Sequence, residues 1–406
     1  MKIMKGNIPV DTIVKINKPP QSKDIDFVDY DGTLLYSYTL DEIQEITELP
    51  PLPTQPGLIC QEWNWSLEDI KAHNRRLIVG ATYITDDGKT RIYINLTEED
   101  RLDVPLFFQQ STSSGVEVDW GDGSPVERFK GGTSVEAIHS YKKSGKYIIA
   151  LNSTNPFFNV IFGGSNKSNG IFGGYSNMTN RYYYANIITK IHFGSNVIIR
   201  DNAFFECRLL SKVTIPNNIT SIGSYAFYNC PSLLTVVIPK GIRTINTHLF
   251  ESCKSLYNVV IPNSVTTIDH YAFNKCNHLL YLIIPNSVTS IGYYMFEECS
   301  LLLNMIIPEK ITQLCYNMFK GCYSLSSITL PNEIKRINSY VFSSCYAIRK
   351  YNFSQYTQVP TLDSTNVFSG ITSECKIIVP DELYDEWIAA TNWSNYADYI
   401  IKVSEV

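Results

Sequence analysis

The sequence lacks long apolar runs, a surplus of basic residues and a secretory leader. No stretch approaches the roughly 18 apolar residues of a membrane-spanning helix, so we expect no membrane insertion. The formal net charge is −5 and only 18% of residues are charged, so no broad basic field favours binding to nucleic acid. The start of the chain has no apolar signal core, which predicts a soluble protein synthesised in the cytoplasm without a signal peptide.

Patterns of catalytic or metal-binding residues are missing as well. The sequence contains no GxSxG, HExxH or phosphate-binding glycine loop. Its six histidines are scattered, and those within the repeats described below occupy variable positions. We therefore predict no catalytic residues, no cofactor, no metal site and no enzymatic activity.

One motif, in contrast, favours an enzyme. The segment 27–34, FVDYDGTL, resembles the nucleophile motif of HAD-type phosphatases. That resemblance would make Asp29 the nucleophile and Asp31 the acid and base. The same fold requires alternating strands and helices downstream, whereas a proline-rich segment follows here. We interpret the Asp-Gly pair as a turn. A phosphatase and a glycan hydrolase remain the enzymatic alternatives.

A 23-residue repeat is the dominant feature that the sequence does contain. A phenylalanine stands three places before each repeated cysteine, and a proline stands nine places after six of them. A fixed period in the twenties indicates a solenoid of stacked turns. The repeated cysteines are Cys207, Cys230, Cys253, Cys276, Cys299, Cys322 and Cys345.

Each repeat contains one short strand with LxxLxL spacing. In the unit from Pro216 to Pro239, the residues Leu233, Val236 and Ile238 should point inward. Pro239 should end the strand because it cannot donate to a β-ladder. Seven such strands stacked about 4.8 Å apart would give a core roughly 33 Å long.

The repeated cysteines are expected to be core residues. Neighbouring Cβ vectors in a stack run parallel, which does not suit a disulfide, and seven cysteines cannot all be paired. No CxxC or histidine-rich spacing accompanies them, as a zinc site would require. A thiol in this position behaves as a small buried apolar side chain.

The recurring run SIGxYAFxxCxSLxxVxIP resembles the BspA-type leucine-rich repeats over about residues 187–380. The spacing from Phe342 to Phe368 is 26 residues, so the repeat decays there. After it, Leu383, Trp387 and Ile388 share one face of an expected helix. The resemblance implies that residues 381–406 form a helical C-terminal cap.

The first 77 residues allow two interpretations of their role. The proline-rich residues 1–57 suggest either an attachment arm or a packed linker, with a short helix behind the N-cap Thr39. Residues 58–77 are expected to form a helical connector in which Ser66 caps the helix.

Residues 78–152 are expected to form a β-sandwich, with early strands at Leu77–Thr85 and Thr90–Leu96. The WGDG turn and the HxYxxxGxY strand entry resemble those of PKD-like domains. Asp119 and Asp122 lie in that turn, where we favour an ordinary tight turn over calcium. Residues 153–186 are rich in glycine and asparagine and form either a linker or an N-terminal cap of the solenoid.

A candidate binding face lies on the outside of the repeat sheet. Positions two, three and five of each LxxLxL strand face outward, and the central turns are apolar there. An apolar centre with a polar rim suggests an interface, unless capping elements cover it or this repeat simply favours β-branched residues. The candidate residues are Leu234, Val237, Tyr257, Val260, Leu280, Tyr281, Ile283, Leu303 and Ile306.

Together these patterns predict a mainly β protein: a PKD-like β-sandwich, then a leucine-rich repeat solenoid with a helical C-terminal cap. We expect a non-enzymatic adhesion or interaction protein, similar in layout to structural proteins of tailed phages. In the virion, the arm would contact other virion proteins and the solenoid a host surface protein or glycan. A homo-oligomer is expected, a trimer by analogy. The alternative is a bacterial cell-surface adhesin.

Overall fold

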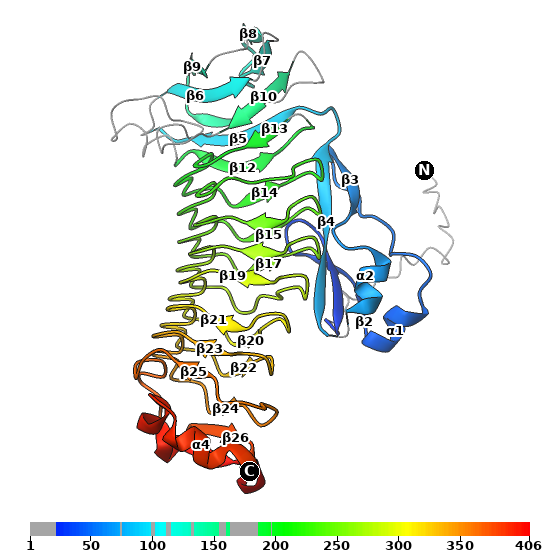
Figure 1. The fold of residues 1–406 in the computed structure, drawn as a ribbon. Helices are drawn as coiled ribbons and strands as arrows, with labels where there is room; N and C mark the ends of the chain where they lie inside the picture. The colour runs from blue at the N-terminus through cyan, green and yellow to red at the C-terminus, as the bar shows by residue number, and fades with distance from the viewer. Residues whose placement is uncertain are drawn as a thin grey trace, which may run out of the picture.

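A computed structural model describes residues 22–73, 75–98, 102–110, 115–130, 134–153, 160–162, 186–195 and 197–406. The chain forms a long β-solenoid with a two-sheet domain on its first turn and a helical cap on its last (Figure 1). A small domain of strands and helices lies against one side of the solenoid (Figure 1). The predicted mainly β class is confirmed. No helix in the described ranges has the length and apolar character needed to cross a membrane.

The small side domain, here called the N-terminal domain, comprises residues 22–85. Its sheet has the strand order β2-β1-β4-β3. Both predicted helices are present: Thr39 forms a capping box at α1, and Ser66 accepts from the Asp69 amide at α2. The elements are β1 (Ile25–Val28), β2 (Leu34–Tyr38), α1 (Leu40–Glu45), β3 (Leu58–Trp63), α2 (Leu67–Ala72) and β4 (Leu77–Thr85).

This domain corrects two of the predicted boundaries. Residues 22–57 are packed into the domain, with Ile25, Phe27 and Ile43 fully buried, so they form no free arm. Residues 1–21 of the expected arm lie outside the described residues. Strand β4 was expected in the sandwich, but it pairs with β1 and β3 because its buried face completes the core of the N-terminal domain.

The two-sheet domain follows directly after β4. One sheet has the order β14-β12-β5-β10-β7-β8 and the other β13-β11-β6-β9. The strands of this domain are β5 (Thr90–Leu96), β6 (Asp103–Gln110), β7 (Val116–Asp119), β8 (Glu127–Phe129), β9 (Ser134–Ser140), β10 (Gly145–Ser153) and β11 (Val160–Phe162).

Aromatic residues from the two sequence motifs meet in this domain. Trp120 is fully buried, and the His139 ring stacks on it at 4.8 Å. The Tyr141 hydroxyl donates to the Trp120 carbonyl at 2.8 Å, and its ring contacts that of Tyr147. The resemblance to PKD-like domains stays a prediction.

The two-sheet domain covers the first turn of the solenoid. Strand β5 pairs antiparallel with β12, and β12 pairs parallel with β14, so one sheet runs from the domain into the repeats. This pairing supplies hydrogen-bond partners for the backbone groups that the edge strand of the first turn would otherwise expose. Most of the glycine- and asparagine-rich residues 153–186, including the second IFGG segment, lie outside the described residues.

The solenoid has two rows of short parallel strands. The first row, which forms the leucine-rich repeat sheet, contains β12 (Ile188–His192), β14 (Lys212–Thr214), β15 (Thr235–Val237), β17 (Asn258–Val260), β20 (Asn304–Ile306), β22 (Ser327–Thr329), β24 (Lys350–Asn352) and β26 (Lys376–Val379). The second row contains β13 (Val197–Ile199), β16 (Thr244–Ile245), β18 (Thr267–Ile268), β19 (Ser290–Ile291), β21 (Gln313–Leu314), β23 (Arg336–Ile337) and β25 (Thr361–Leu362).

The repeated phenylalanines and cysteines form the interior of this stack. The rings of Phe250 and Phe273 lie 5.7 Å apart and nearly parallel, and the neighbouring pairs repeat this geometry. Each repeated thiol from Cys230 to Cys345 donates to the carbonyl of the phenylalanine 26 residues earlier, as Cys276 does to Phe250 at 3.2 Å. The thiols are therefore core groups that also satisfy buried carbonyls.

Two corners of each turn require left-handed backbone. One series runs through Tyr225, His248 and Tyr271, and a second runs through Asn229, Ser252 and Lys275, all with φ between 51° and 62°. Non-glycine residues adopt this conformation at a cost, which the packing of neighbouring turns must offset.

The predicted C-terminal cap is present. Trp387 and Trp393 are fully buried, and both contact the Phe353 ring of the last turns. Leu383 and Ile388 pack against the same core, as the expected helix face requires. The elements are η2 (Asp381–Leu383), α4 (Tyr384–Ala389), η3 (Trp393–Tyr399), β27 (Ile400–Lys402) and η4 (Val403–Glu405).

We predict that the repeated cysteines and Cys60 are inert in the folded protein. Burial raises the pKa of Cys253 to about 12, and burial likewise raises the pKa of Cys60 to about 12. At pH 8 both groups therefore stay protonated, and the thiolate that reacts with disulfide reagents is not formed. Labelling with an aromatic disulfide should proceed only as urea unfolds the chain. Rapid labelling of Cys253 or Cys276 in native protein would contradict this.

Candidate functional site

The N-terminal domain lies on the outer face of the leucine-rich repeat sheet. Val28 and Ile78 from this domain bury Val237 and Val260 of the sheet, whose exposed fractions are 6% and 2%. Two of the predicted binding residues are thus covered by the chain itself. This corrects the prediction for Val237 and Val260. The covering side chains come from two segments with different predicted roles: Val28 lies in the expected arm, and Ile78 lies in a strand expected in the sandwich.

Hydrogen bonds fix the docked position. The Asn64 amide donates to the Ile238 carbonyl at 3.1 Å, and the Trp65 indole donates to the Ile261 carbonyl at 3.0 Å. These carbonyls directly follow β15 and β17, which are strands of the leucine-rich repeat sheet in adjacent turns. The two hydrogen bonds therefore hold β3 and α2 in register with the repeats. At the other side of the interface, Thr235 donates to the Tyr30 carbonyl at 3.0 Å. Asn64 and Trp65 are buried, where a lost partner would leave a polar group unsatisfied.

Gly80 in β4 allows the close approach of the two sheets. A Cβ atom at Gly80 would lie 2.6 Å from Cγ1 of Val237. No side chain larger than hydrogen therefore fits between β4 and the sheet at this point.

We predict that Gly80→Ala loosens the N-terminal domain from the solenoid. The added methyl group would overlap Val237, and overpacking of this kind costs about 1–3 kcal/mol. Hydrogen exchange within β1–β4 should become faster, while exchange in the repeats from β20 onward stays unchanged. The double substitution Gly80→Ala with Val237→Ala should restore slow exchange, because it removes the overlap. Equal exchange in Gly80→Ala and the unmodified chain would show that this contact does not hold the domain.

The sheet face beyond the N-terminal domain is uncovered. We call this surface the open strip; it consists of the outward side chains of the turns from Leu280 to Asn352. Its upper part is apolar: Leu280, Leu303 and Ile306 have exposed fractions of 38%, 42% and 41%. Four of the predicted residues, these three and Tyr281, lie on the open strip.

A groove of about 180 Å³ marks the upper boundary of the open strip. Tyr281, Ile283 and Ile306 line one side, and His73, Arg75 and Arg76 line the other. The Arg76 guanidinium lies 5.2 Å from the centre of the Tyr281 ring, which is cation–π geometry. Arg75 donates to Asn286 at 2.8 Å and pairs with Glu309 at 3.2 Å.

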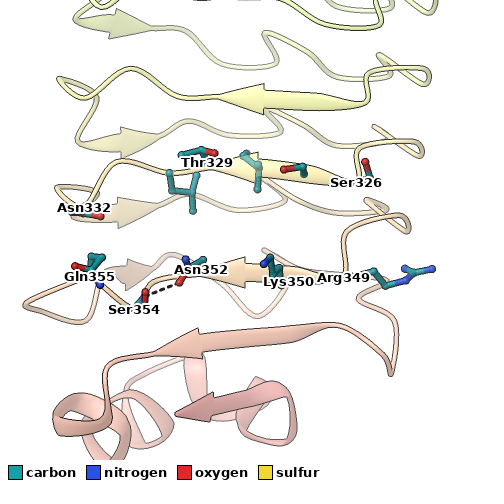
Figure 2. Close-up of a pocket in the computed structure, with 11 residues that line it drawn as sticks. Ser326, Thr329, Asn332, Arg349, Lys350, Asn352, Ser354 and Gln355 are labelled. Atoms are coloured by element: carbon teal, nitrogen blue, oxygen red, sulfur yellow. Dashed lines mark hydrogen bonds between the residues drawn. The ribbon is translucent and has the colours of Figure 1, made fainter. Parts of the chain in front are cut away.

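The lower part of the open strip is polar. A groove of about 460 Å³ lies between the turns of β22 and β24, and Figure 2 shows the side chains that line it. Arg349 lies at one end of this groove, and Asn332 and Gln355 lie at the other (Figure 2). The sequence patterns did not single out this part, because its outward side chains are polar, as on any solvent-exposed sheet face.

The remaining predicted residues lie at the margin of the N-terminal domain. Leu234 and Tyr257 are partly exposed, and the Tyr257 hydroxyl donates to the Asp31 carbonyl at 3.4 Å. Ile283 is partly buried and packs against the core of the N-terminal domain. Whether these residues contact a partner stays a prediction.

The phosphatase-like motif serves as a turn that contacts the solenoid. The Asp29 amide donates to the Thr33 carbonyl at 2.8 Å, and Gly32 has φ 86°. The Asp31 carboxylate pairs with Lys212 at 3.2 Å and accepts from the Thr33 hydroxyl. Burial of Asp31 is outweighed by these hydrogen bonds and the lysine charge, which together lower the pKa of its carboxyl group. Asp31 is thus engaged in the interface, whereas the Asp29 carboxylate accepts from the Gln55 amide at 2.6 Å within the N-terminal domain.

Asp119 and Asp122 also occupy an ordinary turn. Asp119 accepts from the Gly121 amide at 2.9 Å, and Asp122 contacts the His139 ring nitrogen at 2.9 Å. Hydrogen bonds from Ser124 and His139 hold the pKa of the Asp122 carboxyl well below its usual value. Among the described residues, no cluster of three or more histidine, cysteine, aspartate or glutamate side chains is placed to hold a metal ion.

Comparison with known proteins identifies the repeats. A family model of the BspA type leucine-rich repeat region matches residues 176–302 and 266–385 of this chain. Together the two matches extend from residue 176 to 385, which is more than half of the chain. A search of curated proteins found no match.

Solved leucine-rich repeat structures resemble the solenoid part. A leucine-rich repeat protein from T. pallidum is 23% identical with a TM-score of 0.34, and the match covers 49% of this chain and 86% of that protein. One from Bacteroides ovatus is 19% identical with a TM-score of 0.38, covering 51% and 63% respectively. One from Eubacterium ventriosum is 20% identical with a TM-score of 0.31, covering 45% and 59%.

Proposed function

Because the chain belongs to the BspA-type leucine-rich repeat family, we propose that it is a non-enzymatic adhesion or interaction protein that binds its partner with the open strip. The observation that carries this proposal is the contrast between equivalent positions of the sheet. Val237 and Val260 are covered by the N-terminal domain, whereas Ile306 at the equivalent position is exposed. Leu280 and Leu303, at the second strand position, are also exposed, as Leu234 and Tyr257 are in the earlier turns. Contiguous apolar side chains left exposed beside charged ones are characteristic of interaction surfaces.

The partner is proposed to be a host surface protein or glycan. We place the protein in a phage virion, where other virion proteins would be further partners, and the bacterial cell surface is the alternative. The support is the similarity of the layout to tailed-phage structural proteins, with a recognition module after an N-terminal segment. A homo-oligomer, a trimer by analogy, remains part of the proposal.

We predict that Leu303→Asp combined with Ile306→Asp abolishes binding to washed host cells. Two carboxylates would replace the exposed apolar surface, and burying them under a partner without compensation is unfavourable. The loss should exceed tenfold in a cell-binding titration, since even one such buried charge costs more than about 1.4 kcal/mol. The fold should persist because both side chains are exposed.

Leu301→Asp is the matched control, because Leu301 is 40% exposed in the same turn but precedes the strand. It should bind cells like the unmodified chain. Unchanged binding by the Leu303 and Ile306 double variant would refute a role for the open strip. Val260→Asp is a poor test of partner binding, because that residue is buried beneath the N-terminal domain.

The proposed location predicts the result of mass spectrometry on purified particles and washed cells from the source culture. Peptides from residues 186–406 should co-purify with particles in a fixed ratio to the known particle proteins. Peptides found only on cells, with none on particles, would replace the virion by the bacterial surface as the place of action.

A further inference from the structure

The polar groove of the open strip has a distinctive set of lining groups. Its volume of about 460 Å³ falls within the range of about 300–1,000 Å³ that is usual for small-ligand sites. None of the lining residues carries a carboxylate. The lining comprises the hydroxyl side chains Ser326, Ser327, Thr329 and Ser354, the amide side chains Asn332, Asn352 and Gln355, the cations Arg349 and Lys350, and the apolar Ile328 and Leu330.

Positive charge accumulates at this groove. Lys350 lines it, and Lys376 is its in-register partner on the adjacent strand β26. Adjacent strands lie about 4.8 Å apart, so the two ammonium-bearing side chains start close together, which is unfavourable without a counter-charge. In the described part of the chain neither lysine has an ion-pair partner. Arg349 pairs with the exposed Glu374 at 3.3 Å.

The concentration of cations contrasts with the whole chain, whose formal net charge is −5. The outward positions of the five turns from Leu280 to Lys376 contain no aspartate or glutamate. Such a local field favours a negatively charged ligand. Charge complementarity therefore specifies an anionic partner for this groove.

The neutral groups specify a ligand rich in hydroxyl groups. Ile328 and Leu330 are buried, so the groove offers no exposed apolar or aromatic anchor of the kind that dominates protein interfaces. Hydroxyl and amide side chains both donate and accept, as a sugar hydroxyl requires.

The backbone is also open at the groove. Strands β22 and β24 belong to different hydrogen-bonded sheets, so the backbone ladder is interrupted between the two turns that form the groove.

We propose that the polar groove binds an acidic oligosaccharide, a hydroxyl-rich chain that carries carboxylate or sulfate groups. Lys350 and Lys376 would neutralise the acidic group, and the amide and hydroxyl side chains of the groove would bind the sugar hydroxyls. This inference rests on the proposed use of the open strip for binding, and it names the ligand class and the segment responsible.

The test is calorimetric titration of the full chain with three tetrasaccharides and one peptide. Tetragalacturonate supplies carboxylates, a heparin-derived tetrasaccharide supplies sulfates, and maltotetraose is neutral. An oligoglutamate peptide supplies carboxylates without sugar. At least one acidic tetrasaccharide should bind more tightly than both maltotetraose and the peptide, and binding should weaken as salt rises.

The variant Lys350→Gln with Lys376→Gln should weaken that binding about tenfold, since each exposed charge contact contributes modestly. Lys142→Gln with Lys143→Gln makes the same change in net charge on the two-sheet domain and should leave binding unchanged. Asn352→Ala should weaken binding at all salt concentrations, because its role does not depend on charge.

Three outcomes would overturn the proposal: no binding of either acidic tetrasaccharide, tighter binding of the peptide, or equal binding by the Lys350 and Lys376 double variant. None of these outcomes affects the proposed function itself. That function fails separately, if the Leu303 and Ile306 double variant still binds cells.

Discussion

In-register stacking of the 23-residue turns is the constraint on which the rest of the structure depends. No turn can bury its own apolar face, so each phenylalanine ring is covered by the ring of the next turn, as with Phe250 and Phe273. The repeated thiol of each turn, such as Cys276, also donates to a carbonyl of the preceding turn, here that of Phe250. A side chain of different size or polarity at these positions would break both contacts at once.

Stacking leaves an exposed edge at each end, and the chain covers the two edges differently. At the first turn, β5 of the two-sheet domain pairs with β12 and extends the sheet. At the last turn, β27 adds one more parallel strand, and α4 places Trp387 over Phe353. The 26-residue spacing before the cap is absorbed outside the strands, because Lys350 and Lys376 still pair in register. That retained register is what brings the two lysines together.

The N-terminal domain determines which part of the outer sheet face can meet a partner. Its docking uses apolar contacts at Val237 and Val260, while Asn64 and Trp65 fix its position along the stack. Along the stack, the contacts of this domain end at Arg75 and Arg76: Arg75 pairs with Glu309, and the Arg76 guanidinium contacts Tyr281. Beyond this boundary the strip changes from apolar at Ile306 to polar and cationic at Lys350, so one surface offers two kinds of contact.

The sequence alone was sufficient for features that repeat or that depend on neighbouring residues. The 23-residue period fixed the solenoid, the inward LxxLxL positions and the burial of the cysteines, because each turn has the same environment as the next. Thr39 and Ser66 located α1 and α2 because capping is a contact between residues three apart. Leu383 and Trp387 indicated the cap for the same reason of helical spacing.

Tertiary structure alone decided what lies on the outer face. Val237 and Ile306 occupy equivalent positions and are both β-branched, yet one is buried and the other is 41% exposed. The difference arises from β4, which lies more than 150 residues earlier in the chain and approaches through Gly80. No local pattern encodes a contact between segments so distant, because it depends on how the surfaces of two separate sheets fit together. The repeat was therefore determined by the sequence, and the open strip by the docking of one domain on another.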